Sequence, residues 1–315
     1  MLDAAGNPGV KPQDKWYDFA EGWLNKQIEK YGSDEIAFSD KSLLVETLAY
    51  FFEGGISSFH IVSDFDATLT KYWVSPGVKF VGGHNILGLT DCVSPEFISK
   101  LGYLEEKFVN YETSLNHTVQ EKSSKLVEWY EQVYQVFIDE GLTRDDLAKM
   151  VSQVHTLYRE GTKELISLSE AKQIPLMICS AGISDIIDAI LRFDGLLKEN
   201  AIIVSNKMVF ATQAPFKLTS FKKPYIHVYN KGDMEIPLDS KHFKACVPRK
   251  NLILLGDSLG DVNMGVRLLH TNILKVGLLN YDVERLLPHY LEAFDVVLAK
   301  DTHLSFVNTL LQELE

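Results

Sequence analysis

Short, uninterrupted apolar runs alternate with helical patterns through the second half of the sequence. These runs are "IPLMICSA" at 174–181, "NAIIVSN" at 200–206, "NLILLGD" at 251–257, "NILKVGLLN" at 272–280 and "FDVVLA" at 294–299. Strands that are buried on both faces are apolar along their whole length, and their alternation with helices is typical of a parallel sheet. We therefore predict an α/β fold with a doubly wound, mainly parallel, Rossmann-like sheet.

A long helical stretch interrupts this pattern. Residues 95–160 contain helical periodicity only, and Thr143 and Asp146 have the spacing of a capping box at the start of the last helix. The preceding run, "SFHIVSD" at 58–64, is typical of a strand, so the helices are inserted after the first strand of the sheet. We expect N-terminal helices in residues 1–55, a core domain from residues 56–80 and 161–315, and a helical cap in residues 81–160.

Net charge and hydropathy limit the partners of such a protein. The 315 residues include 31 basic and 43 acidic side chains, which gives a formal net charge of −12. This charge disfavours nucleic-acid polymers and anionic membranes as partners. No apolar run reaches the roughly 18 residues of a membrane span, and the first residues lack a basic, apolar leader. We expect a cytoplasmic monomer that acts on a small molecule.

Cysteines and histidines give no local metal signature. Cys92, Cys179 and Cys246 form no C-x-x-C pair, and no two histidines have H-x-x-x-H spacing. The sequence therefore predicts neither a disulfide framework nor a zinc site.

Polar side chains follow three of the predicted strands where each strand ends. "SDFDATLT" places Asp64 and Asp66 after the first strand, "GDSLGD" places Asp257 and Asp261 after a later one, and Ser180 ends a third. Because ligands of doubly wound sheets bind beyond the carboxyl ends of the strands, we expect these residues to converge.

The residue types at these strand ends suit phosphate chemistry. Neighbouring carboxylates repel each other, which raises one pKa unless a cation compensates, and oxygen ligands favour Mg²⁺. The Ser180 hydroxyl and the amides of Ala181 and Gly182, just before a predicted helix, can hold an oxyanion or a phosphate. Each motif alone could be a polar turn or a helix cap. Their shared position favours a metal-assisted nucleophile at the rim of the sheet.

The motifs resemble those of the haloacid-dehalogenase-like phosphatases. "SDFDATLT", "HNI", "VEWY", "CSAGISD", "IHVYNK" and "LLGDSLGD" resemble, in this order, the cytosolic 5′-nucleotidase type III (pyrimidine 5′-nucleotidase) family. The resemblance implies Mg²⁺-dependent hydrolysis of nucleoside 5′-monophosphates, with CMP and UMP as the expected substrates. Hydrolysis of 7-methylguanosine monophosphate, or phosphate transfer to another nucleoside, is the alternative within enzymes. A catalytically inactive nucleotide-binding scaffold is the alternative of another class.

The resemblance also implies roles for the acidic residues. Asp64 would attack phosphorus and form an aspartyl phosphate, and Asp66 would protonate the leaving 5′-oxygen and then activate water. Mg²⁺ would be held by Asp64, the backbone carbonyl of Asp66, and Asp257. Asp261 would support these ligands from behind.

The phosphoryl oxygens would be bound by Ser180, the Ala181 amide and a lysine. Spacing alone leaves five lysines open: Lys207, Lys217, Lys222, Lys223 and Lys231. We select Lys231, because "HVYNK" belongs to the stretch that resembles the family.

The helical insertion is expected to close over the site and to select the substrate. The resemblance implies that Glu112 accepts hydrogen bonds from the base and that Tyr72 and Trp129 stack on it. His84 and Asn85 would line the same pocket. Each of these residues could equally be structural. Val133 stands where the resemblance leads us to expect a serine, so base preference stays open.

Overall fold

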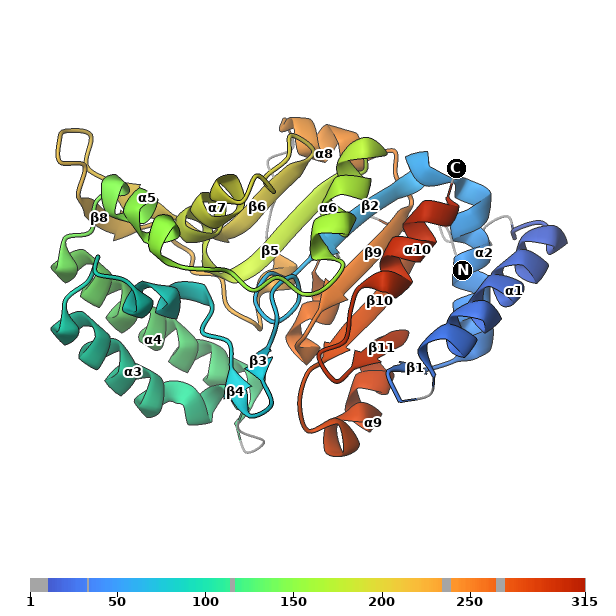
Figure 1. Cartoon of the computed structure of the whole chain (residues 1–315), viewed down its shortest axis with the longest axis horizontal. Helices are drawn as coiled ribbons and strands as arrows, with labels where there is room; N and C mark the ends of the chain where they lie inside the picture. Colours follow the sequence, from blue (N-terminus) through green and yellow to red (C-terminus); the bar gives the residue numbers. More distant parts are fainter. Residues whose placement is uncertain (1–10, 33, 114–116, 234–238, 265–269, 315) are drawn as a thin grey trace.

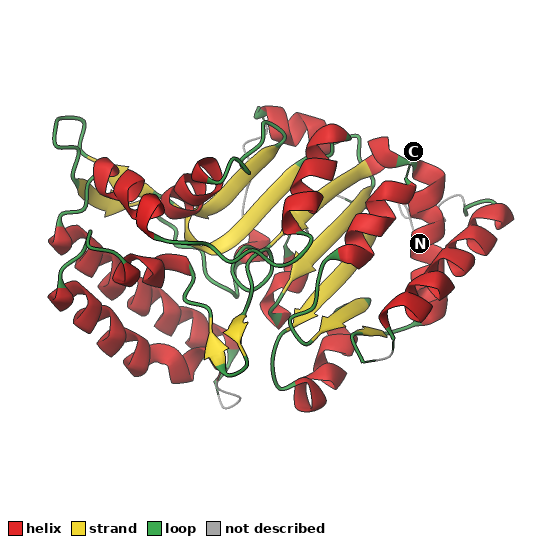
Figure 2. Ribbon diagram, in the orientation of Figure 1, coloured by secondary structure: helices red, strands yellow, loops and turns green. Residues whose placement is uncertain are grey.

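A central sheet organises the chain (Figures 1 and 2). The computed structural model describes residues 11–32, 34–113, 117–233, 239–264 and 270–314. Within these residues the sheet has the order β1-β11-β10-β9-β2-β5-β6. Its strands are β1 (Ile36–Phe38), β2 (Phe59–Ser63), β5 (Leu176–Ile183), β6 (Ala201–Asn206), β9 (Asn251–Gly256), β10 (Asn272–Leu279) and β11 (Val296–Ala299). All pairs are parallel except β1 with β11, which confirms the predicted α/β fold.

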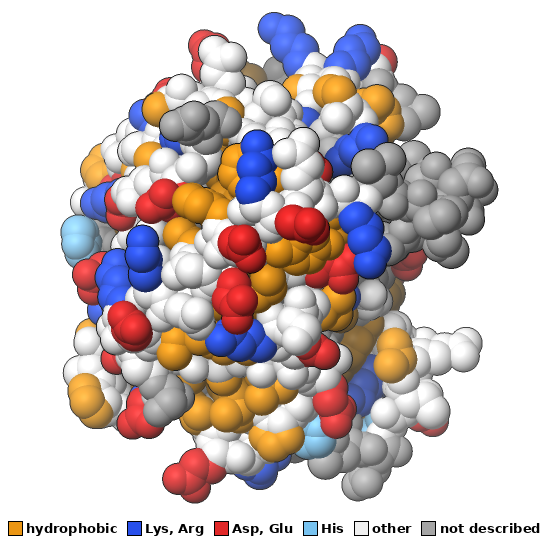
Figure 3. Space-filling model, turned by 90° about the vertical axis from the view of Figure 1, so that its right-hand side faces the viewer, with side chains coloured by type: hydrophobic (Ala, Val, Ile, Leu, Met, Phe, Trp, Pro, Cys, Tyr) orange, Lys and Arg blue, Asp and Glu red, His pale blue; other side chains and the backbone are white. Residues whose placement is uncertain are grey.

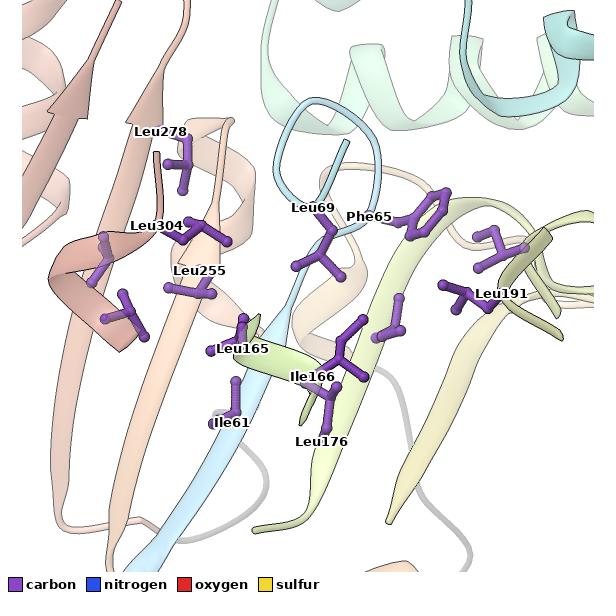
Figure 4. Close-up of a cluster of buried hydrophobic side chains, with 14 of the residues drawn as sticks. Ile61, Phe65, Leu69, Leu165, Ile166, Leu176, Leu191, Leu255, Leu278 and Leu304 are labelled. Atoms are coloured by element: carbon purple, nitrogen blue, oxygen red, sulfur yellow. The ribbon is translucent and has the colours of Figure 1, made fainter. Parts of the chain in front are cut away.

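Helices cover both faces of the sheet. Side chains of α2 (Lys41–Gly54), α6 (Thr162–Ala171), α7 (Ser184–Phe193) and α10 (Ser305–Glu313) pack in one core cluster, and those of α8 (Lys241–Cys246) and α9 (Val283–Ala293) in another. Successive residues of β2 alternate between the two: Ile61 belongs to the first cluster and Val62 to the second. Figure 4 shows Ile61 beneath Leu165 of α6. Full burial of such aliphatic side chains contributes roughly 1.5–3 kcal/mol each.

The N-terminal segment adds two helices and one strand. Helix α1 (Asp14–Tyr31) packs on α2, and α2 packs against β9 and β10. The side chain of Asp40 caps α2 by accepting hydrogen bonds from the amides of Ser42 and Leu43. Strand β1 then pairs with β11. The helices were predicted, whereas this edge strand was not.

The segment between β2 and β5 contains most of the remaining helices. It holds the hairpin β3 (Trp73–Ser75) and β4 (Val78–Lys79) and the helices α3 (Pro95–Thr113), α4 (Val119–Glu140) and α5 (Arg144–Gln153). Helices α3 and α4 pack on each other (Figure 1). Helix α5 instead packs against α7, a helix that covers the sheet. A second hairpin, β7 (Met208–Phe210) and β8 (Leu218–Phe221), contacts α4. The division into three domains stays a prediction.

The surface near α1 and β1 mixes both signs of charge. Figure 3 shows acidic and basic side chains interspersed there, with hydrophobic side chains between them. On the described part of this face, no continuous basic stripe of the kind that follows a nucleic-acid backbone is visible. Among the described residues, no helix has the length and apolar character needed to cross a membrane.

Candidate active site

Three adjacent strands bring the predicted residues together. β9, β2 and β5 are neighbours in the sheet, and Asp257 and Asp64 follow the carboxyl ends of the first two. One carboxylate oxygen from each of Asp64, Asp257 and Asp261 lies within 4.8 Å of the other two. A cavity of about 570 Å³, lined by Asp64, Asp66, Ser180 and Asp257 among others, opens beside them. The predicted convergence is therefore present, while the chemical roles of the residues stay predictions.

Lys231 lies at the centre of this cluster. It begins the short 3₁₀ helix η3 (Lys231–Asp233), and only 4% of its surface is exposed. Its Nζ donates to Asp64 Oδ1 and to Asp261 Oδ1, at 2.7 Å each. Lys223, another of the five open lysines, forms a surface ion pair with Glu131 instead. The structure thus places in the cavity the lysine that the resemblance selected.

Asp261 is held behind the cavity. Its Oδ2 accepts hydrogen bonds from the amide and the hydroxyl of Ser258, at 2.9 and 2.8 Å, and its Oδ1 accepts from Lys231. Both carboxylate oxygens are therefore engaged by protein groups. Close packing requires Gly256, because a Cβ there would lie 2.3 Å from Asp261 Cβ. This glycine therefore makes room for the side chain of Asp261.

Burial makes the negative charges of the cluster costly. It raises the pKa of Asp64 to about 7 and that of Asp257 well above its ordinary value, and the neighbouring carboxylates act in the same direction. Burial acts to lower the pKa of Lys231, but Asp261 and Asp64 outweigh it and raise that pKa well above its ordinary value. Within the described residues, only Lys231 forms an ion pair with these carboxylates. When all three carboxylates are ionised, one ammonium leaves the cluster with excess negative charge, and a further cation would neutralise that charge and so favour the ionised form.

The donor set fits Mg²⁺. Mg²⁺ takes oxygen ligands at about 2.0–2.1 Å, so two ligand oxygens lie about 2.9 Å apart in cis and about 4.2 Å apart in trans. The limit of 4.8 Å, which holds for one oxygen of each carboxylate, is compatible with both arrangements after small adjustments. Asp64 and Asp257 are the residues that could hold the ion directly, since Asp261 is engaged elsewhere.

Asp66 lies at the mouth of the cluster. Its Oδ1 accepts a hydrogen bond from the amide of Gly83 at 2.9 Å, which fixes the carboxyl group. Burial raises the pKa of Asp66, whereas the Gly83 amide and Lys231 act to lower it. A carboxyl group with a raised pKa can keep a proton closer to neutral pH, as a general acid must.

A buried arginine fastens the loop that carries Asp66. The guanidinium of Arg159, which is 1% exposed, donates to the carbonyls of Ala67 and Thr68 at 2.5 and 2.7 Å. It also forms an ion pair with Asp301 at 3.0 Å and donates to Asn280 Oδ1 at 2.8 Å. Ala67 has a left-handed φ of 56°, so this turn needs external support. Arg159 could not be predicted from local sequence patterns, because its partners lie far away along the chain.

The predicted phosphate cradle, which consists of Ser180, Ala181 and Gly182, lies within a strand and not directly before a helix. Ser180 does not end its strand: β5 continues to Ile183, and α7 begins at Ser184 with Ile183 at the N-cap position. The alternative that Ser180 caps this helix is therefore wrong. Pairing with β6 becomes irregular between Cys179 and Ile183, which leaves the intervening residues facing the cavity. The Ser180 Oγ accepts from the Gly182 amide at 2.9 Å, so its own proton can be donated to a ligand.

Helix α4 is tied to this cradle through Tyr130. The Tyr130 hydroxyl donates to the carbonyl of Ala181 at 2.9 Å, and the Asn206 Nδ2 donates to the same oxygen at 2.9 Å. Helix α4 belongs to the helical insertion, whereas Ala181 belongs to the sheet. This hydrogen bond therefore couples the position of the insertion to the cradle.

Replacing Tyr130 with phenylalanine tests this coupling. We expect kcat/KM to fall about 2- to 13-fold, because a hydrogen bond worth about 0.5–1.5 kcal/mol is lost while Asn206 still satisfies the carbonyl. Steady-state kinetics and thermal unfolding measure the change. Tyr103→Phe, on the exposed face of α3, is the matched control and should have no effect. Equal kinetics for both variants would show that the bond does not position the cradle.

The predicted base-binding residues are placed in part. Tyr72, Asn85 and Trp129 line the cavity, whereas the side chains of His84 and Glu112 lie outside the described part of the structure. Tyr72 stacks on Tyr281, with ring centroids 5.1 Å apart, and Lys79 Nζ lies 4.6 Å from its ring centre. Trp129 meets Tyr130 edge to face at 4.7 Å.

Two further residues change the expectation about the base. Val133, where a serine was expected, is 1% exposed and belongs to the hydrophobic core. Glu105, which was not among the predicted residues, lines the cavity and accepts a hydrogen bond from Asn85 Nδ2. It lies on α3 next to Glu106, and no local signal separates the two. The lining of the cavity therefore includes a carboxylate as well as aromatic rings.

Comparison with known proteins gives consistent matches. The sequence profile of the pyrimidine 5′-nucleotidase (UMPH-1) family matches residues 67–315. A 7-methylguanosine phosphate-specific 5′-nucleotidase A from Xenopus laevis is 34% identical over 283 residues, which cover 89% of this chain and 96% of the relative. The Homo sapiens 7-methylguanosine phosphate-specific 5′-nucleotidase is 35% identical over 267 residues, which cover 83% of this chain and 86% of the relative. The crystal structure of cytosolic 5′-nucleotidase IIIB bound to cytidine superimposes with a TM-score of 0.80 at 25% identity, covering 91% of this chain and 96% of that one.

Proposed function

The chain belongs to the pyrimidine 5′-nucleotidase (UMPH-1) family of 5′-nucleotidases, and on this premise we propose that it hydrolyses nucleoside 5′-monophosphates at the Asp64 cluster. The observation that carries the proposal is the buried contact of Lys231 with Asp64, beside Asp257 and at the floor of the cavity. We further propose that the reaction passes through an aspartyl phosphate on Asp64.

Asp64 is the proposed nucleophile. Lys231 holds its Oδ1 at 2.7 Å and so fixes the rotation of the carboxylate toward the cavity. In the first step a carboxylate oxygen of Asp64 bonds to phosphorus while the bond from phosphorus to the 5′-oxygen breaks. Bound Mg²⁺, held by Asp64, Asp257 and the backbone carbonyl of Asp66, would neutralise charge on the phosphoryl oxygens.

Asp66 is the proposed acid and base. Burial raises its pKa, so its carboxyl group can bring a proton to the leaving 5′-oxygen. The resulting carboxylate then takes a proton from the water that hydrolyses the aspartyl phosphate. Ser180, the Ala181 amide and Lys231 would hold the phosphoryl oxygens during both steps, because all three border the cavity. An inactive scaffold would not need this complete set of groups.

Pyrimidine nucleotides are the proposed substrates. Lys79 lies over the ring of Tyr72, so a neutral base fits beside Tyr72 better than a cationic one. The cytidine in the superimposable structure of cytosolic 5′-nucleotidase IIIB supports this choice. 7-Methylguanosine monophosphate is the second candidate, because several relatives are named for it and the cationic base could lie between Trp129 and Glu105. The name of the superimposable structure also supports a cytosolic location.

A phosphate-release screen tests the function and ranks the substrates. With Mg²⁺ we expect release from CMP and UMP, and we expect EDTA to lower the rate by about 100-fold or more, because the excess negative charge of the cluster then opposes the phosphate. GMP and 7-methyl-GMP are measured in parallel. Release from 7-methyl-GMP alone would select the second candidate. No release from any of the four would contradict the proposed function.

A further inference from the structure

A second group of metal-binding side chains lies at the opposite end of β2 from the active site. His60 is in β2, His242 and Cys246 are in α8, and all three are buried. Their ring nitrogen and sulfur atoms lie within 4.8 Å of one another. His60 precedes Asp64 by four residues, so about 13 Å of strand separates this group from the catalytic cluster. The proposed nucleotidase reaction uses none of the three residues.

We propose that His60, His242 and Cys246 form a binding site for a zinc ion. Imidazole nitrogen and thiolate sulfur are the ligands that zinc prefers in proteins. His60 Nε2 and His242 Nε2 are 3.2 Å apart. Tetrahedral zinc with Zn–N bonds of about 2.0–2.1 Å requires about 3.3–3.4 Å between two nitrogens, so this edge of the site is already close to its final length.

The sulfur needs only a small movement. Zn–S bonds of about 2.3 Å place sulfur about 3.5 Å from each ligand nitrogen. Because Cys246 Sγ lies within 4.8 Å of one ring nitrogen of each histidine, it would approach those nitrogens by at most about 1.3 Å. His242 and Cys246 are four residues apart on α8 and therefore share one face of that helix. The spacing H-x-x-x-C is the local signal, and His60 completes the site from a distant strand.

A fourth side chain orients the first histidine. His60 Nδ1 lies 3.3 Å from His270 Nε2, so His60 can donate its Nδ1 proton there and keep the Nε2 lone pair for the ion. Burial lowers the pKa of His60 well below its ordinary value and that of His242 to about 4. Both rings are therefore neutral near pH 7, the form in which histidine binds metals.

Charge balance and access are also compatible with zinc. Burial raises the pKa of the Cys246 thiol to about 12, with Arg249 acting against it, so the ion would displace one proton as the Zn–S bond forms. The resulting thiolate offsets part of the repulsion between the ion and Arg249, whose Nη1 donates to the Phe59 carbonyl. His242 also borders a groove of about 1430 Å³, which gives a route for the ion and for a water as fourth ligand.

Cobalt substitution of the full-length protein tests the site. Titration with Co²⁺ in the presence of excess Mg²⁺ should produce the thiolate-to-cobalt charge-transfer band at one equivalent per chain, and Zn²⁺ should abolish the band. Cys246→Ser should lose the band, whereas Cys92→Ser, which changes a cysteine away from the cluster, should keep it. Cobalt bound to the carboxylates of the active site gives no thiolate band, so the two sites are distinguishable and loss of nucleotidase activity would not affect the readout.

A measurement on the unmodified protein guards against a variant that does not fold. Zn²⁺ at 100 times its Kd should raise Tm by about 3 °C or more relative to the protein in EDTA, with Mg²⁺ constant. Absence of the band and of this Tm shift in the unmodified protein would overturn the proposal and leave a hydrogen-bonded chain of three imidazoles. A band that persists in Cys246→Ser would also overturn it.

Discussion

Replacing Asp64 with asparagine is expected to lower kcat by about 10⁴-fold or more, because an amide cannot form the acyl phosphate on which the proposed reaction depends. The fold should persist, since the introduced amide has the same shape as the carboxylate and its oxygen can still accept a hydrogen bond from Lys231. Burial raises the pKa of Asp64 to about 7, so a neutral amide also removes repulsion from Asp257 and Asp261. The Tm of the metal-free variant should therefore equal or exceed that of the unmodified protein.

The control for this experiment is Asp18→Asn, which changes an exposed carboxylate of α1. It should leave kcat unchanged. Beryllium fluoride with Mg²⁺ mimics an aspartyl phosphate and should raise the Tm of the unmodified protein but not that of the Asp64→Asn variant. Undiminished turnover in Asp64→Asn would show that another group attacks phosphorus.

Replacing Lys231 with methionine is expected to reduce both turnover and stability. kcat should fall about 10³-fold, because the ammonium that orients Asp64 and balances the phosphoryl charge is lost. The free energy of unfolding of the metal-free protein should fall by about 3 kcal/mol, because two buried carboxylates lose their shared partner. Single-turnover kinetics and denaturant unfolding measure the two effects separately.

Lys223→Met is the matched control, since this surface lysine pairs with Glu131, lies over the ring of Tyr225 and has a side chain that is 63% exposed. Its stability should change by less than about 1 kcal/mol, and its kcat should be unchanged. Loss of stability without loss of kcat in Lys231→Met would restrict Lys231 to a structural role. Normal values of both would contradict its placement in the active site.

The sheet and the convergence of the acidic residues could be predicted from local patterns. Each apolar run identifies a strand, and the rule that parallel strands end at a common edge brings Asp64 and Asp257 together without knowledge of the strand order. The edge strand Ile36–Phe38 could not be predicted in this way. It is only three residues long, too short for a periodic pattern, and β11, which it pairs with, lies more than 250 residues further along the chain.

Other parts of the site depend on contacts that local patterns do not contain. Lys231 follows an irregular loop, so spacing left five lysines open and only the family resemblance selected it. Tyr130 and Glu105 lie on helices whose apolar periodicity reports packing but not which polar residue faces a cavity. The approach of His60 to His270 joins positions 210 residues apart and is likewise visible only after folding.

Because Arg159 anchors the Ala67–Thr68 turn, the conformation of this turn depends on residues far away in the sequence. The guanidinium links the turn beside Asp64 to Asp301 and Asn280, which come from the last sixth of the chain. Substitutions at Asp301 or Asn280 can therefore loosen this turn without changing a residue of the cavity lining. Substitutions that impair activity should therefore be found at Arg159, Asn280 and Asp301 as well as among the residues that line the cavity.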